Sequence, residues 1–130
     1  MDDCIFCKIG KENSEKKIYE NDSFFSIYDV NPLVEGHSLV ISKKHFKTIL
    51  DVQNSLGSEL VDCIKKTVLE LVKDYDSEGF NILNNFNEVA GQLGPHVHFH
   101  ILPRKKDQNA ELTFIDKSTR KKIKMAKEKK

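Results

Sequence analysis

A chain of 130 residues, of which 38% are hydrophobic and 32% charged, has the size and composition of one small globular domain. It contains no apolar run near the ~18 residues that a membrane helix needs, and its first residues lack the pattern of a secretory signal. Three cysteines, an odd number, argue against a disulfide framework, so we expect a protein of the reducing cytoplasm.

The first predicted element is a short helical turn over residues 4–10 that Gly10 closes. It carries Cys4 and Cys7, whose spacing suits either a redox pair or half of a zinc site. A redox pair normally follows a strand, and none precedes these cysteines. A zinc site needs two more ligands, for which His45 and His96 are candidates; two free thiols are the remaining alternative.

Three strands are predicted next, over residues 17–20, 24–30 and 37–42, from their β-branched and aromatic residues. Turn-forming residues separate them, including Pro32 and Gly36 in the second connection. Because the connections are short, we expect an antiparallel meander.

Residues 55–75 form the clearest predicted helix, with Ser55 as its N-terminus. Apolar residues recur there every three or four positions, at Leu56, Leu60, Ile64, Val68, Leu71, Val72 and Tyr75. Cys63 lies in this pattern and is predicted to be buried. A fourth strand is expected over residues 79–84.

Three histidines alternate with apolar residues in the last predicted strand, over residues 96–102. On a strand His96, His98 and His100 share one face about 7 Å apart, and the apolar side chains enter the core from the other. Gly91, Gly94 and Pro95 form a preceding turn whose free N–H groups suit an anion. The alternatives are a histidine-rich polar face and a metal site, including a metal-dependent hydrolase, although no water-activating carboxylate is nearby.

These elements predict an α+β fold, with a five-stranded, mostly antiparallel sheet, one long helix and one or two short helices on one face. Residues 1–110 form the domain, and residues 111–130 form a basic C-terminal tail. Residues 117–130 include eight basic residues and one acid, a net charge of +7 within a total of +1. We expect a frayed, solvated helix there. We do not expect nucleic acid as a partner because no aromatic residue is interleaved for base stacking.

The alternating histidines and following apolar residues at 96–102 resemble the signature of the histidine triad (HIT) family of nucleotide hydrolases and transferases. Residues 36–45, 80–85, 91–92 and 103–104 are similar to flanking motifs of the same family in the same order. The resemblance covers about residues 4–104 and points to the zinc-containing bacterial members of the Hint branch. It implies a homodimer in which two sheets join.

The resemblance also implies a reaction. His98 would attack the α-phosphorus of a purine nucleotide conjugate, either a phosphoramidate or a dinucleoside polyphosphate. Water would then release a nucleoside monophosphate from the nucleotidyl-histidine. His100 matches the imidazole that stabilises the transition state, and His37 matches a fourth histidine close to the triad. Gln92 and the amides of residues 91–94 match further donors.

The remaining assignments concern the binding pocket. Asn85 matches a contact near the phosphates, and Asp29 matches the acid that binds the ribose hydroxyls. Leu93 occupies a position that often carries serine or threonine in the family, so only its main-chain N–H can act there. The residues that match the apolar wall around the base are Ile5, Phe6, Ile9, Ile27, Val30 and Leu39. For at least two of them, ordinary core packing is the better interpretation.

By the same resemblance, Cys4, Cys7, His45 and His96 hold a structural zinc ion, and no organic cofactor is expected. Two other functions remain open from the sequence. One is a purine-nucleotide sensor or interaction module with vestigial hydrolysis. The other is a zinc-dependent protein that binds nucleic acid through its basic tail.

Overall fold

The computed structural model describes residues 4–12, 15–106, 113–115 and 122–124. Its main elements are α1 (Ile5–Lys11), β1 (Lys17–Glu20), β2 (Phe24–Tyr28), β3 (Ser38–Ser42), α2 (Gly57–Tyr75), β4 (Gly79–Leu83) and β5 (His98–Arg104). Three single turns of 3-10 helix occur in the connections, at Ile49–Asp51, Asn54–Leu56 and Glu88–Ala90. The predicted order of five strands and one long helix is confirmed.

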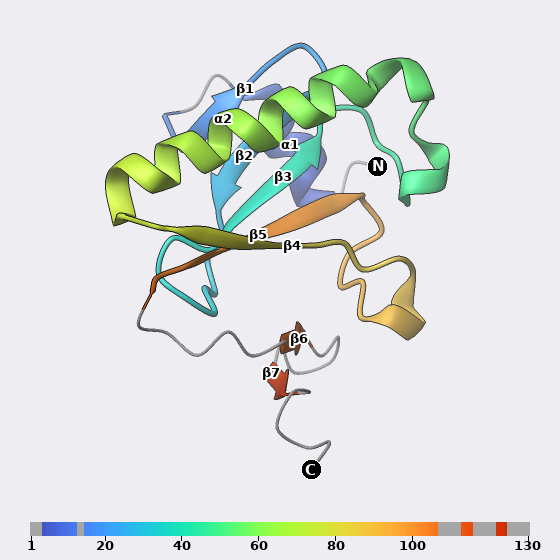
Figure 1. The fold of residues 1–130 in the computed structure, drawn as a ribbon. Coiled ribbons are helices and arrows are strands. Elements are labelled where there is room, and N and C mark those ends of the chain that lie inside the picture. The colour runs from blue at the N-terminus through green and yellow to red at the C-terminus, as the bar shows by residue number, and fades with distance from the viewer. Residues whose placement is uncertain (1–3, 13–14, 107–112, 116–121, 125–130) are drawn as a thin grey trace.

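The five strands form one antiparallel sheet in the order β1-β2-β3-β5-β4 (Figure 1). The first three strands are the predicted meander. The last strand, β5, lies between β3 and β4, so that His98 is opposite Ile41 and His100 is opposite Leu39. The histidine-bearing strand is therefore shielded on both edges by other strands.

The two helices cover opposite faces of the sheet, so the prediction that the helices share one face is wrong. Residues of α2 pack with Phe24, Val40 and Ile101, whereas α1 packs against Phe25, Leu39 and Ile41. The reason is that β2 and β3 are apolar on both faces: every residue of β3 is buried. Figure 1 shows α2 crossing the sheet on one side, with α1 behind the strands.

Several predicted boundaries need correction. Strand β2 ends at Tyr28 instead of residue 30, because the Asp29 carboxylate accepts the Asn31 N–H at 2.8 Å and turns the chain. Helix α1 continues past Gly10 to Lys11; this glycine is instead where α1 approaches the sheet, since an added Cβ would lie 3.0 Å from the Phe25 ring.

Two further boundaries differ at α2 and β5. Helix α2 begins at Gly57 with no side-chain cap, so Ser55 is not its N-terminus: the chain enters α2 through a 3-10 turn. Strand β5 begins at His98, so His96 precedes it. The chain is held there because the Val97 N–H donates to the Phe46 carbonyl at 2.6 Å.

The C-terminal region differs from the predicted helix. Thr113–Ile115 (β6) pairs antiparallel with Lys122–Lys124 (β7). β-Branched and aromatic residues in these segments favour extended structure. The rest of the predicted tail lies outside the described residues. Among the helices that the structure does describe, none has the length and apolarity to cross a membrane.

Candidate functional site

The histidines of β5 face the α1 side of the sheet and are buried. His98 and His100 are 6% and 1% exposed, and their ring centroids lie 5.2 Å apart. Phe99, which lies between them, and Ile101, which follows them, pack with the core on the α2 side. The predicted division of the strand into a histidine face and an apolar face is therefore confirmed for β5. This division arises because successive side chains of any strand point to opposite faces of the sheet.

A backbone carbonyl fixes the tautomer of His98. Its Nδ1 lies 2.8 Å from the His96 carbonyl oxygen. A carbonyl only accepts hydrogen bonds, so Nδ1 carries the proton and the neutral ring has its lone pair on Nε2. His98 also lines a cavity beside α1. In this form the ring is a competent nucleophile.

A relay of hydrogen bonds fixes the tautomer of His100. The Leu33 N–H donates to His37 Nδ1 at 3.0 Å, which places the His37 proton on Nε2. That Nε2–H donates to His100 Nδ1 at 2.9 Å, so the proton of His100 is on its own Nε2. An Asp29 oxygen lies 3.4 Å from His37 Nε2. The relay therefore makes His100, which lines the cavity, a neutral hydrogen-bond donor.

The cavity has a volume of about 800 Å³, within the usual range for small-molecule sites. The predicted base-pocket residues and Asp29 all line it, and it extends to Leu93, Gly94 and Pro95. The Phe6 ring meets the His98 ring edge-on at 5.3 Å, which places the α1 wall against the histidines. Val30, at 89% exposure, lies at the rim. Tyr28 and Asn31 also line the cavity, and no sequence pattern indicated them.

Two predicted phosphate contacts do not line this cavity. The Gln92 amide donates to the Lys47 carbonyl at 2.7 Å and accepts the Asn87 N–H at 2.8 Å, and its residue is 4% exposed. The Asn85 amide donates to the Gly91 carbonyl at 3.3 Å. Both side chains hydrogen-bond to the backbone near the loop that precedes the histidines. They can therefore influence a bound phosphate only by positioning that loop.

Asn84 is a positioning residue that the sequence reasoning missed. Its side-chain amide donates to the His98 carbonyl at 2.9 Å, across the connection that follows β4. The only available signal was the pair of asparagines after an apolar strand, where a polar side chain often satisfies a neighbouring backbone group.

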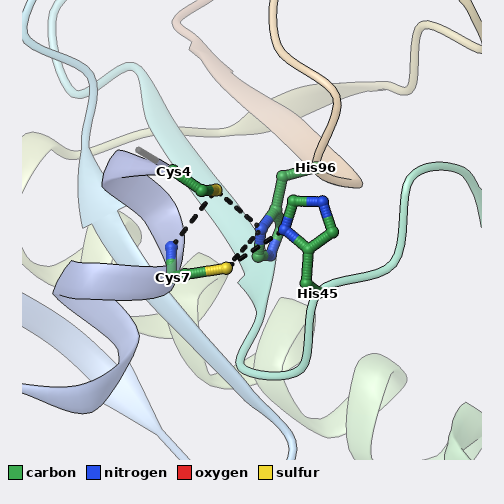
Figure 2. A group of neighbouring side chains, drawn as sticks. All are labelled: Cys4, Cys7, His45 and His96. Atoms are coloured by element: carbon green, nitrogen blue, oxygen red, sulfur yellow. Dashed lines mark hydrogen bonds between the residues drawn. The ribbon is translucent and has the colours of Figure 1, made fainter. Parts of the chain in front are cut away.

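At the other end of the histidine row, four donor atoms from Cys4, Cys7, His45 and His96 lie within 4.8 Å of one another (Figure 2). His45 Nδ1 is 3.1 Å from Cys7 Sγ, and His96 Nδ1 is 3.3 Å from Cys4 Sγ. Donors around one tetrahedral zinc ion are separated by about 3.6 Å. The cluster thus has suitable atoms and spacing for a metal ion.

The tautomer of His96 also suits a ligand. Its Nε2–H donates to the Ser42 carbonyl at 2.7 Å, which leaves the lone pair on Nδ1, the atom that faces the thiols. Burial lowers the pKa of His96 to about 4, which keeps the ring neutral. Burial also raises the pKa of the Cys7 thiol, and a bound cation would favour the thiolate. Both cysteines are free rather than joined.

The three alternating histidines do not converge on one cation. Among the described residues, His96 belongs to the cysteine cluster, whereas His100 groups with Asp29 and His37. The hydrogen bond from His37 Nε2 to His100 Nδ1 explains why these two rings lie so close together. This arrangement argues against a metal-dependent hydrolase that uses the three histidines as ligands.

Helix α1 links the thiol cluster to the cavity. It begins after Cys4, whose sulfur accepts the Cys7 N–H at 3.4 Å as an N-cap. Its next residue, Ile5, is a cavity wall, and the Phe6 ring lies 5.7 Å from the His96 ring and 5.3 Å from the His98 ring. The same short helix therefore supplies two thiols and part of the binding surface.

Comparisons with known proteins agree with this geometry. The sequence profile described as the HIT domain matches residues 10–107. An uncharacterized HIT-like protein of Methanocaldococcus jannaschii is 42% identical over 78% of both chains. An adenylylsulfatase of Arabidopsis thaliana is 40% identical over 81% of this chain and 54% of its own length. An adenosine 5'-monophosphoramidase of Candida albicans is 34% identical over 88% of this chain and 83% of its own.

Solved structures show the same fold. A HIT family protein from Bacillus anthracis is similar with a TM-score of 0.73 and 34% identity, over 82% of this chain and 76% of the other. A Zn-bound histidine triad family protein from Mycobacterium smegmatis has a TM-score of 0.73 and 28% identity, over 82% and 78% of the two chains.

Proposed function

Because this chain belongs to the HIT domain family, we propose that it is a nucleotide hydrolase that cleaves purine nucleotide conjugates at the α-phosphate. Relatives that bear names of this chemistry, an adenylylsulfatase and adenosine 5'-monophosphoramidases, support hydrolysis of a nucleotide bond. The reaction class is then nucleotidyl transfer to a histidine, followed by transfer to water.

The observation that carries the proposal is the tautomer of His98. Its Nδ1–H is held by the His96 carbonyl, so the neutral ring has its lone pair on Nε2, and the residue lines the cavity. In the first step a bond forms between Nε2 and the α-phosphorus. The bond from phosphorus to the leaving group breaks, and its electron pair departs with that group. In the second step water displaces His98 and a nucleoside monophosphate is released.

His100 has the complementary role. The relay from Leu33 through His37 makes its Nε2 a donor, and a donor is what the extra charge on the non-bridging phosphate oxygens needs. The donor is oriented before the substrate arrives, so little reorganisation is required during the reaction. Removing one such preorganised donor commonly slows an enzyme by a factor of about 10²–10³.

The nucleoside occupies the apolar part of the cavity. Asp29 lies on the cavity lining at the end of β2, where its carboxylate can accept two hydrogen bonds from the ribose hydroxyls. The base lies between the α1 wall, including Phe6, and the sheet residues Ile27 and Leu39. Such a slot favours a large flat purine by area and discriminates weakly between adenine and guanine.

The donor set of Cys4, Cys7, His45 and His96 fits a structural zinc ion, which in this proposal joins α1 to the sheet. Two thiols and two imidazole nitrogens would hold the ion, and with four protein ligands its role would be structural rather than catalytic. Its contribution would be to hold in place the side of the cavity that α1 forms.

We also propose a homodimer. Edge strand β4 exposes Ile82 at 52%, and α2 exposes Val61, Leu69 and Val72 at 50%, 61% and 42%. Pairing of two β4 edges would join two sheets and cover apolar side chains of this kind. Sedimentation should show a dimer that Ile82→Lys weakens; a strict monomer at all concentrations would contradict this part.

The decisive experiment incubates the protein with a panel of adenosine and guanosine conjugates, both phosphoramidates and phosphoanhydrides. Mass spectrometry after rapid quenching in a denaturant at neutral to alkaline pH, where a bond between histidine nitrogen and phosphorus survives, should detect a protein adduct bearing one nucleoside monophosphate, and chromatography should detect the free monophosphate. His98→Asn should form neither. Tight monophosphate binding with turnover near background on every conjugate would instead favour a nucleotide-binding module.

A further inference from the structure

The cavity supplies donors for developing negative charge, but in its described lining no imidazole or hydroxyl is arranged to protonate the group that departs. Resting on the proposed function, we infer that this site is specialised for mixed anhydrides of a nucleoside monophosphate with phosphoric, sulfuric or carboxylic acids, and that Leu93 sets this preference over conjugates of basic amines.

His100 is the first group to consider as an acid. Its Nδ1 accepts the proton of His37, and His37 must carry that proton because its own Nδ1 accepts the Leu33 N–H. Protonating His100 on both nitrogens would leave two N–H groups facing each other. In this arrangement His100 is a neutral imidazole, which donates a hydrogen bond well and gives up its proton poorly.

The other imidazoles are committed elsewhere. His98 supplies the attacking nitrogen, and its second nitrogen donates to the His96 carbonyl. His96 donates to the Ser42 carbonyl and directs its lone pair to the thiols, and His45 Nδ1 lies 3.1 Å from Cys7 Sγ. None of these rings is arranged to hand a proton to a leaving group.

A hydroxyl is the next possibility. Tyr28 is the only residue with a hydroxyl in the cavity lining of the described chain. It pairs with Ser38 across β2 and β3, on the face opposite to the histidines, and its ring contacts Tyr75 of α2. Burial raises the pKa of Tyr28 to about 12, so its phenol is also a weak acid. It is therefore poorly placed for protonating a group attached to the phosphorus.

The segment that leads into the histidines, residues 93–95, is apolar where it borders the cavity. Leu93, Gly94 and Pro95 line the cavity and offer no acidic side chain, and proline has no N–H. An added Cβ on Gly94 would meet no atom within 4 Å, so this segment borders open space. A leaving group can be accommodated here by contact with leucine and main chain, without proton transfer from a side chain.

The electron balance then separates two classes of substrate. When the bond between phosphorus and a mixed-anhydride oxygen breaks, the electron pair remains on a phosphate, sulfate or carboxylate oxygen, which is stable as an anion at neutral pH. When a bond to an alkylamine nitrogen breaks, the nitrogen must gain a proton as it departs. A positioned general acid commonly accelerates such a step by about 10²–10⁴-fold.

The test measures how the rate depends on the leaving group. The substrates are adenosine monophosphate conjugates whose leaving groups span a wide range of pKa, from sulfate and carboxylates through phenols to alkylamines. The proteins are the natural chain, Leu93→Ser and Leu93→Ala. Both variants remove the leucine, but only serine adds a hydroxyl, so alanine controls for the change in volume.

For the natural chain, log(kcat/KM) should fall steeply as the leaving-group pKa rises. In Leu93→Ser the ratio of kcat/KM for the alkylamine conjugate to that for the mixed anhydride should rise at least about tenfold over Leu93→Ala, within the range of general-acid effects. A flat dependence in the natural chain, or equal ratios in the two variants, would overturn the inference while leaving the proposed function intact. No turnover or adduct with any conjugate would overturn both.

Discussion

The two faces of β5 perform different tasks although they belong to one strand. On the α1 face, His98 and His100 are buried polar groups whose ring nitrogens meet defined partners. On the α2 face, Ile101 is fully buried among apolar side chains of β2, β3 and α2. Because the side chains alternate, a change on one face leaves the neighbouring residue's environment on the other largely intact.

The two faces are stabilised by different interactions. The α2 face is stabilised by removal of apolar area from water, which tolerates many shapes of similar volume. On the α1 face each polar atom needs a particular partner, since an unsatisfied buried polar group costs about 1–3 kcal/mol. Function is therefore concentrated on the face with specific hydrogen bonds, and stability on the other. Four variants test this separation.

The largest effect on activity is expected for His98→Asn. Asparagine retains an amide that can donate to the His96 carbonyl but has no nucleophilic nitrogen, so turnover should fall at least about a thousandfold. The melting temperature should change little, and monophosphate binding should persist by calorimetry. Activity close to that of the natural chain would show that the chemistry does not pass through this ring.

The largest effect on stability is expected for Leu71→Ala. Leu71 is 0% exposed in the α2-face core, and such truncations usually cost about 2–5 kcal/mol. Chemical denaturation should report that loss, while kcat/KM per folded molecule should stay near that of the natural chain. A large fall in kcat/KM of the folded fraction would mean that the two faces are coupled more tightly than the strand geometry indicates.

An intermediate effect is expected for Cys7→Ser, which alters the attachment of α1. A serine hydroxyl is a poor zinc ligand, so metal content measured by atomic emission should drop. Nucleotide affinity should weaken several-fold, because Phe6 on α1 lines the cavity. Cys63→Ala is the matched control: it removes a buried thiol of α2 and should leave metal content unchanged. Equal metal content in both variants would exclude the four-residue site.

The smallest effect is expected for Asp62→Asn, on the α2 side. The Tyr19 hydroxyl donates to the Asp62 carboxylate at 2.5 Å, and this hydrogen bond, followed by that from Asn21, lowers the pKa of Asp62 below 3.8. A carboxyl with a depressed folded-state pKa adds stability above its unfolded pKa, and that stability is lost as the pH falls through the folded value.

The difference in melting temperature between the natural chain and Asp62→Asn should therefore be present at about pH 7 and shrink as the pH falls below about 4, the ordinary pKa of an aspartate. Nucleotide turnover should be the same in both at neutral pH. A difference in melting temperature that grows as the pH falls would show that folding does not lower the pKa of Asp62.

Much of the fold could be predicted because it depends on local patterns. The alternation around His98 predicted a strand with two unlike faces, and the three-to-four spacing from Leu56 to Tyr75 predicted α2. The position of β5 between β3 and β4 could not be predicted, since it depends on pairing between distant segments. The placement of α1 on the opposite face from α2 was missed for the same reason.

The candidate site shows a similar division. The sequence placed Asp29, Phe6 and Leu93 in a common pocket through their resemblance to known motifs, and all three line the cavity. It could not show that Gln92 turns to the Lys47 carbonyl, because that choice depends on which unsatisfied backbone group lies nearby. Asn84 was missed because its partner, the His98 carbonyl, is recognisable only in the folded chain.

The alternation of the three imidazoles follows from the order of residues alone, because that order sets the order of side chains along any extended segment. The chemical role of each ring, in contrast, depends on contacts that form when the chain folds. The Ser42 carbonyl directs a lone pair of His96 to the thiols, whereas the Leu33 N–H, acting through His37, makes His100 a donor. A ring nitrogen keeps or gives up its proton according to the group that it meets, and these groups come from distant parts of the chain.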